Sequence, residues 1–308
     1  MVRGTRVQYW NVGLFGLYCV FGALVFIGAK LGLPYVPPVL LAALRLDIAG
    51  IVLLPVVGMF EEYRLPRTRR DVLGVVLTGV FTLGLMNTLL LTGQQHVSSV
   101  VGSIAYSLMP LLMTGFAVLV LPTASRDWVD AVGIGLGLVG VIVVIGPTPS
   151  NLLTARVVGI GIMVSSVAIF ALGSVLTQRL DPSIPRTALT AWGALLAGAF
   201  NHVVSLGVGE SVASIEWTTG TLSALFVLGV LATGVLYTVH FELIDRIGPS
   251  RTSLTFYLQP IVASVFGWLL FGERVALGVF VGFAVVVVGF VLVERRPFWA
   301  AMRHRKPW

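Results

Sequence analysis

Ten apolar runs, each about 20 residues long, alternate along the chain with short polar segments. A helix of that length crosses the hydrocarbon core of a bilayer, and the alternation typical of membrane barrel strands is absent. Because hydrocarbon cannot satisfy free backbone N–H and C=O groups, helices are the remaining way to span a membrane. We expect spanning helices at residues 11–31, 38–60, 72–92, 97–121, 129–146, 157–178, 187–208, 219–241, 250–271 and 275–293.

The composition supports a membrane environment. Of the 308 residues, 57% are hydrophobic and 11% are charged, and the mean hydropathy is +0.98. A soluble domain carries roughly 25% charged residues, so the soluble globular class is excluded. The first run follows Arg3 and Arg6 as a secretory signal would, but it is long for one, and no clear small-residue cleavage site follows Lys30. We therefore predict an all-α integral membrane protein with an uncleaved first helix.

The basic residues predict the orientation of the chain. With a cytoplasmic N-terminus and ten crossings, sixteen of the 20 Lys and Arg residues fall in cytoplasmic segments, and three fall outside: Lys30, Arg156 and Arg274. This bias follows the positive-inside rule. We expect both termini in the cytoplasm of a multi-pass plasma-membrane protein. The net charge of +7 is spread over short loops and forms no basic face, so nucleic acid is not an expected partner.

The two halves of the chain match at a shift of 150 residues. Coincidences of Gly and Pro at one offset are harder to obtain by chance than coincidences of apolar residues. The shift places Gly79 on Gly229, Gly84 on Gly234, Thr88 on Thr238, Ser103 on Ser253 and Pro110 on Pro260. After the loss of one residue, the pair Gly133 and Gly140 falls on Gly282 and Gly289. We predict two five-helix repeats, residues 1–150 and 151–308, inverted because five is odd.

Inverted repeats indicate a function. Two similar halves of opposite orientation can exchange roles, which gives one conformation open to each side of the membrane. Alternating access by a transporter needs two such states of similar free energy. A structural or enzymatic membrane protein has no comparable need for them.

Several motifs then show a family resemblance. The second half carries Gly248-Pro249-Ser250, Leu258-Gln259-Pro260 and Gly272-Glu273, and the first half carries Arg45 and Ser107 to Pro110. In the order and spacing of these motifs, the chain resembles the EamA-type branch of the drug/metabolite transporter superfamily over nearly its whole length. The resemblance implies a small-solute exporter or permease with a central cavity. In one departure, Pro122-Thr123 stands where the family closes its fourth helix with Gly-Glu.

Polar residues inside the apolar runs are the candidate binding residues. Such groups are costly when they face lipid, so we expect them to point inward, where they either bind substrate or hydrogen-bond between helices. We expect Pro110 and Pro260 to kink their helices, which shapes the bundle or frees carbonyls to line the cavity. The candidate substrate-binding residues are Asn87, Tyr106, Ser107, Tyr237, His240, Tyr257 and Gln259.

The ionisable candidates have alternative interpretations. Arg45 either forms an interhelical ion pair, or snorkels to the outer surface, or anchors an anion; we favour the structural interpretations. His240 either packs or takes part in proton coupling. Glu273 is expected to cap the start of the tenth helix, where an N-terminus favours an acid. The pairs Gly133…Gly137 and Gly278…Gly282 allow close helix approach, either between the fifth and tenth helices or across a homodimer.

Enzymatic motifs are absent from the sequence. It has no Gly-Lys-Ser/Thr phosphate loop, and its four histidines and one cysteine show no metal-ligand spacing. We expect no catalysis, no metal and no cofactor. The predicted function is secondary transport of a small metabolite such as an amino acid. The alternatives are a nucleotide-sugar or sugar-phosphate exchanger of the same fold, and a membrane-embedded sensor or enzyme.

Overall fold

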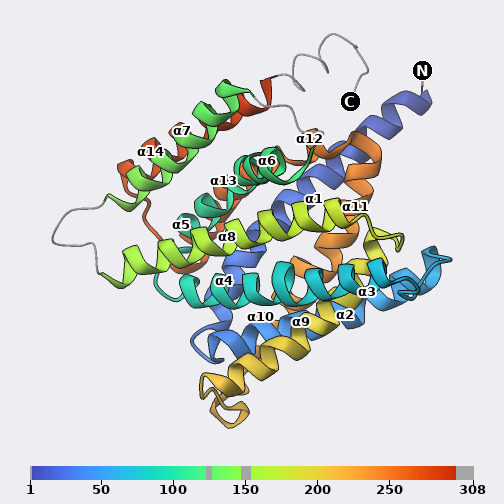
Figure 1. The fold of residues 1–308 in the computed structure, drawn as a ribbon. Coiled ribbons are helices and arrows are strands. Elements are labelled where there is room, and N and C mark those ends of the chain that lie inside the picture. The colour runs from blue at the N-terminus through green and yellow to red at the C-terminus, as the bar shows by residue number, and fades with distance from the viewer. Residues whose placement is uncertain (1, 123–126, 147–153, 296–308) are drawn as a thin grey trace.

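The computed structural model describes residues 2–122, 127–146 and 154–295. All regular structure in these ranges is helical, as expected (Figure 1). Thr123, considered above, lies outside the described residues. The elements are α1 (Val2–Gly32), α2 (Pro38–Phe60), α3 (Arg69–Val76), η1 (Leu77–Leu85), α4 (Met86–Gln94), α5 (Ser99–Tyr106), α6 (Met109–Val120), α7 (Trp128–Ile145), α8 (Ala155–Leu180), α9 (Arg186–Gly207), η2 (Val212–Ser214), α10 (Thr219–Leu225), η3 (Phe226–Val235), α11 (Leu236–Ile247), α12 (Pro249–Thr252), α13 (Thr255–Phe271) and α14 (Leu277–Val293).

Eight continuous helical stretches are long and apolar enough to cross a membrane. They correspond to the first eight predicted runs. The ninth and tenth runs form the shorter apolar helices α13 and α14, of 17 residues each. The ninth run is shortened because the chain turns at Ser253–Leu254, between α12 and α13.

Two of the spanning stretches contain a π-helical segment at their centre. η1 and η3 occupy similar places in the two halves of the chain. In each segment a threonine hydroxyl donates to the carbonyl five residues earlier: Thr82 to Leu77 at 3.3 Å, and Thr233 to Leu228 at 2.6 Å. A wide turn of this kind displaces side chains from the α-helical register and is frequent at functional sites.

The two predicted proline kinks take different forms. Pro260 lies inside α13. Pro110 lies in the first turn of α6, just after an interruption at Ser107–Leu108 within the stretch Ser99–Val120. The interruption relieves the clash of the proline ring with the preceding helical turn. The hydroxyls of Thr114 and Ser264 donate to the carbonyls of Pro110 and Pro260.

Close glycine contacts join α7 to α14, which lie side by side in Figure 1. A Cβ atom added at Gly140 would stand 2.6 Å from the carbonyl oxygen of Gly282, and one at Gly133 would stand 2.6 Å from that of Gly289. Gly278, the other member of its predicted pair, has no atom this close. The small-residue pattern therefore packs two helices of one chain, and a homodimer stays a prediction.

The connections between helices gather at two ends of the bundle. The Glu273 end holds the links α1–α2, α4–α5, α9–α10 and α13–α14, and the Asp71 end holds the links α2–α3, α8–α9 and α11–α12 (Figure 1). Contacts within each end confirm the grouping. At the Glu273 end the Glu216 N–H donates to the carbonyl of Tyr35 at 3.0 Å. At the Asp71 end Asp71 accepts from the N–H groups of Ser183 and Ile184.

Candidate functional site

Arg45 is the most deeply buried basic side chain among the described residues, at 4% exposure in the middle of α2. Its Nη2 donates to the hydroxyl of Thr233, on η3, at 2.8 Å. Its Nε and Nη1 atoms are buried and have no hydrogen-bond partner. No acidic side chain in the described part of the chain forms an ion pair with it. The structure therefore supports neither the interhelical ion pair nor the snorkelling that we favoured from the sequence.

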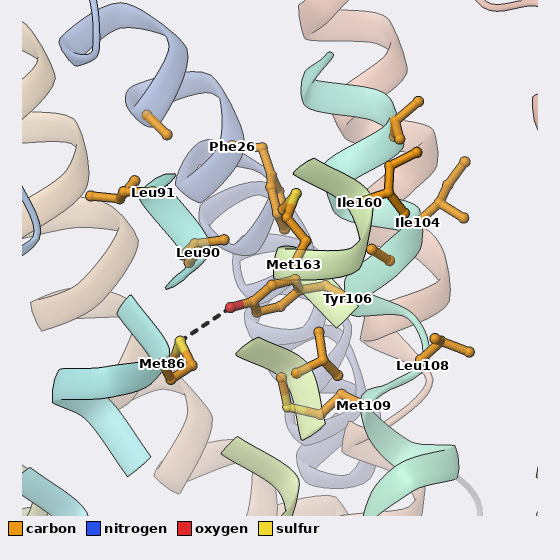
Figure 2. Packing of buried hydrophobic residues seen from close by; sticks show 14 of the residues in the cluster. Phe26, Met86, Leu90, Leu91, Ile104, Tyr106, Leu108, Met109, Ile160 and Met163 are labelled. Atoms are coloured by element: carbon orange, nitrogen blue, oxygen red, sulfur yellow. Dashed lines mark hydrogen bonds between the residues drawn. The ribbon is translucent and has the colours of Figure 1, made fainter. Parts of the chain in front are cut away.

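Two predicted tyrosines lie near this guanidinium. Tyr106 and Tyr237 are both close enough to Arg45 to interact with it electrostatically. The Tyr106 hydroxyl is hydrogen-bonded to that of Ser166, on α8, at 2.8 Å, and lies 3.1 Å from the sulfur of Met86. Figure 2 shows the Tyr106 ring beside Phe26 and Met163, with its hydroxyl directed at Met86. Five different spanning stretches therefore supply the residues of one central site, namely Arg45, Met86, Tyr106, Ser166 and Tyr237.

An aromatic cluster continues from Tyr237 toward the Asp71 end. Tyr237 stacks on Phe241 with ring centroids 6.2 Å apart, and Phe241 lies 5.6 Å from His240. His240 stacks on Tyr18 of α1 at 5.2 Å, and Tyr18 meets the edge of Phe256 at 6.4 Å. The cluster presents apolar faces together with hydroxyl and imidazole groups. We name these five residues the aromatic cluster.

The predicted residues Asn87 and His240 are among those that keep unpartnered polar atoms. Asn87 is buried in α4, its amide nitrogen donates to the carbonyl of Leu83 at 2.8 Å, and its Oδ1 atom has no partner. The Nδ1 atom of His240 is likewise buried without a partner. Both atoms have hydrogen-bonding capacity that the chain itself leaves unused. A proton-coupling role for His240 stays a prediction.

Three other predicted residues are held in packing contacts or in bonds within their own helix. The Ser107 hydroxyl donates to the carbonyl of Ile104, one turn earlier, at 2.6 Å. Tyr257 stacks on Phe290 of α14 with centroids 4.0 Å apart. Gln259 lies against Gly22, so it fills the contact between α13 and α1. Neighbouring sequence positions of a helix face different directions, which is why this group separates from the central site.

Glu273 joins three segments at its end of the bundle. Its carboxylate pairs with the ammonium of Lys30, at the end of α1, and accepts from the N–H of Ser99 at 3.2 Å. Ser99 is the first residue of α5, so the acid does meet a helix N-terminus. It is not the N-terminus that we expected, because the N-cap of α14 is Ala276, which lies three residues beyond Glu273.

A small cavity of about 290 Å³ lies beside this ion pair. Polar side chains from several links border it, among them His96, Arg156, Glu273 and Arg274. It is separate from the central site around Arg45, because none of its lining residues belongs to α2 or η3. Among the described residues, no group of three His, Cys, Asp or Glu side chains could hold a metal ion.

Asp71 ties the two halves together at the opposite end. One oxygen accepts from the N–H groups of Ser183 at 2.8 Å and Ile184 at 3.0 Å, in the link between α8 and α9. The other accepts from Thr68, which completes a capping box at the start of α3, and from the Tyr63 hydroxyl. This bond to Asp71 raises the pKa of the Tyr63 hydroxyl.

Burial differs between the two ends of the bundle. All eight residues of α5, which runs from the Glu273 end to the central site, are buried. Its continuation α6, toward the Asp71 end, buries only Met109, Pro110 and Leu111. Likewise α11 buries only Val239 and Leu243 of its twelve residues. α5 is therefore enclosed by its neighbours along its whole length, whereas α6 and α11 keep open faces.

Sequence reasoning missed several members of the central site. Tyr18, Ser166 and Thr233 were not identified as candidates from the sequence. Tyr18 could have been found as the single polar aromatic inside the first apolar run. Thr233 could not, because its role depends on the π-helical turn of η3.

A bundle of long apolar helices around buried polar groups defines a multi-pass membrane protein. The sequence model of the EamA-like transporter family matches residues 10–146 and 157–295, and the chain belongs to this family. It is 24% identical to the uncharacterized transporter YoaV of Bacillus subtilis, over 91% of this chain and 95% of that protein. It is 28% identical to the uncharacterized inner membrane transporter YedA of Escherichia coli K12, over 91% and 89%.

Two further comparisons extend this result. The chain is 25% identical to the S-adenosylmethionine/S-adenosylhomocysteine transporter of Chlamydia trachomatis serovar L2, over 85% of this chain and 82% of that protein. A solved crystal structure of a protein with 17% sequence identity superposes with a TM-score of 0.65, over 94% of this chain and 98% of the other. That likeness shows the fold alone.

Proposed function

We propose that the protein is a secondary transporter that moves a small metabolite, such as an amino acid, by alternating access around Arg45. The proposal takes the chain as ten crossings in two inverted repeats, residues 1–150 and 151–308. The family match covers each half in turn, and η1 and η3 recur in both halves, which supports this division. Inverted halves give a transporter two conformations of opposite access.

One observation carries the proposal: Arg45, a buried cation that forms no ion pair in the described residues, meets polar side chains of other helices inside the bundle. Its Nε and Nη1 atoms keep no hydrogen-bond partner, and buried atoms of Asn87 and His240 elsewhere in the bundle are also unpartnered. Unsatisfied polar groups inside a membrane are costly, and they are typical of a substrate pathway. The tight packing of α5 and the ion pair of Glu273 close one side.

The Lys30–Glu273 pair acts as a gate in this proposal. It joins α1 and α5 to the link that precedes α14, so these segments separate when the Glu273 end opens. A contact present in one conformation and absent in the other shifts the population of the two states. By the distribution of basic residues, the Glu273 end faces outward and both termini are cytoplasmic in the plasma membrane.

Amino-acid-like solutes suit this site better than the alternative of nucleotide sugars or sugar phosphates. Phosphate groups call for several cationic side chains, and Arg45 is the single deep one among the described residues. The relative named for S-adenosylmethionine and S-adenosylhomocysteine carries compounds that contain an amino-acid group. Within the described ranges, no group of three metal-ligating side chains supports the sensor or enzyme alternative.

Flux measurements test the proposal. The purified protein is reconstituted in proteoliposomes, and uptake of a panel of amino acids, sugars and organic cations is measured. We expect saturable uptake of at least one amino acid. If folded protein, verified by its thermal unfolding midpoint, transports no solute of any class, the proposal is wrong.

A further inference from the structure

The charge of Arg45 is uncompensated within the described chain. The acid nearest to it in sequence, Asp47, is hydrogen-bonded to His202 of α9 at 2.7 Å. The partner that Arg45 does have, the hydroxyl of Thr233, is neutral and also donates to the carbonyl of Leu228. The guanidinium therefore retains its full positive charge and two nitrogens with no acceptor.

Such a group is expensive inside a bilayer. Buried cations are normally paired with an acid, and a lone one marks a pathway or a binding site for an anion. Hydrophobic packing alone does not explain Arg45, since a leucine at this position of α2 would bury apolar surface at no electrostatic cost. The missing counter-charge must come from outside the chain.

We infer that Arg45 binds the carboxylate of the transported solute, an inference that rests on the proposed transport function. A guanidinium matches the planar geometry of a carboxylate, and the hydrogen bonds between them are charge-assisted. Because no second basic side chain of comparable burial stands nearby in the described residues, the site neutralises one negative charge. It fits a carboxylate better than the double charge of a phosphate monoester.

The surroundings of Arg45 define the rest of the solute. Tyr237 lies near the guanidinium and begins the aromatic cluster, which extends through Phe241 and His240 to Tyr18. Aromatic faces of this kind bury an apolar or aromatic body through dispersion and ring stacking. The solute class is therefore a monocarboxylate with an apolar or aromatic body, and neutral amino acids are members of it.

Ligand-induced stabilisation of the full-length protein in detergent tests this inference. L-phenylalanine, L-leucine and 3-phenylpropionate are each compared with their amides, which keep the shape and lack the carboxylate. We expect the acids to raise the thermal unfolding midpoint and the amides to bind about 10- to 100-fold more weakly, because a charge-assisted interaction is lost. Inorganic phosphate is tested in addition, and we expect it to leave the thermal unfolding midpoint unchanged.

Variants place the effect at Arg45. Arg45→Gln should weaken binding of the acids by the same factor and leave the amides unchanged, and Arg45→Lys should be intermediate. The control is Arg274→Gln, which removes an exposed basic residue at the Glu273 end. If Arg45→Gln fails to fold, the comparison of acid with amide on the unaltered protein still decides whether binding requires a carboxylate.

Several outcomes would overturn the inference. These are equal binding of acid and amide, undiminished binding of the acids to Arg45→Gln, stronger stabilisation by phosphate, and no binding of any carboxylate. None of them contradicts transport as such, because the flux panel also contains sugars and organic cations. Only the absence of all saturable flux would remove both proposals.

Discussion

The ammonium of Lys30 and the carboxylate of Glu273 form an ion pair between residues 243 positions apart in the chain. Lys30 lies at the end of α1, and Glu273 precedes α14, so the pair joins the first and second halves at one end of the bundle. The carboxylate also accepts from Ser99 at the start of α5. Three segments thus depend on one largely buried acid.

The first prediction concerns this closure. Glu273→Gln removes the charge that holds Lys30, and we expect the Glu273 end to open more often. In a Cys19→Ala background, a cysteine placed at the buried Val101 should react about two- to fivefold faster with a membrane-impermeant maleimide, since the Lys30 side chain is 36% exposed and such pairs contribute up to about 1 kcal/mol.

The matched control for this measurement is Arg274→Gln, which alters the exposed neighbour and should leave the labelling rate unchanged. The double variant Lys30→Glu with Glu273→Lys restores the charge pair and should recover part of the protection. Equal labelling of Glu273→Gln and the unaltered protein would show that the pair does not gate access.

The second prediction tests the contact between α7 and α14. Gly140→Ala places a methyl group 2.6 Å from the carbonyl oxygen of Gly282, and overpacking of this kind costs about 1–3 kcal/mol. We expect a lower thermal unfolding midpoint in detergent. Gly135→Ala, on the same helix with no atom within 4 Å, is the control and should be neutral or stabilising. A neutral Gly140→Ala would mean that α7 and α14 are farther apart than described.

The third prediction separates two predicted tyrosines. The buried Tyr106 hydroxyl has a partner in Ser166, whereas the buried Tyr257 hydroxyl has none. Tyr106→Phe should therefore lower stability by about 1 kcal/mol, and Tyr257→Phe should be neutral or stabilising. Unfolding midpoints of both variants provide the measurement. A loss of saturable uptake in Tyr257→Phe, with stability retained, would return Tyr257 to the substrate site.

The fourth prediction concerns Asp71. Asp71→Ala leaves the N–H groups of Ser183 and Ile184 without their acceptor and removes the capping box at the start of α3. We expect the unfolding midpoint to fall by about 5 °C or more. Glu62→Ala, at an exposed position of the preceding link, is the control. An unchanged midpoint in Asp71→Ala would show that the two halves do not depend on this link.

Most helices could be predicted from the sequence, because an apolar run long enough to cross a bilayer has few alternatives to a helix. The ends of α2 and α9 fall within one residue of their predicted limits. The break before Pro110 and the turn at Ser253–Leu254 were not predicted. Both depend on local competition between backbone hydrogen bonds and packing, which the apolar pattern does not record.

The candidate site was predicted in part. A polar side chain within an apolar run is costly when it faces lipid, so it is expected to point into the bundle. This argument identified Asn87, Tyr106, Tyr237 and His240. Sequence reasoning could not separate them from Ser107, Tyr257 and Gln259, which have the same polarity and lie on similar runs. Only the rotation of each helix decides which side chains face Arg45.

The sequence by itself determined that this chain is a helical membrane protein of the EamA-like type, because the length and spacing of apolar runs and the order of its motifs are local properties. The tertiary structure decided that Arg45 forms no ion pair among the described residues, that Glu273 accepts from the first N–H of α5, and that α5 is enclosed by its neighbours along its whole length. Each of these depends on which helices meet, and residues far apart in the chain make those contacts only after it has folded.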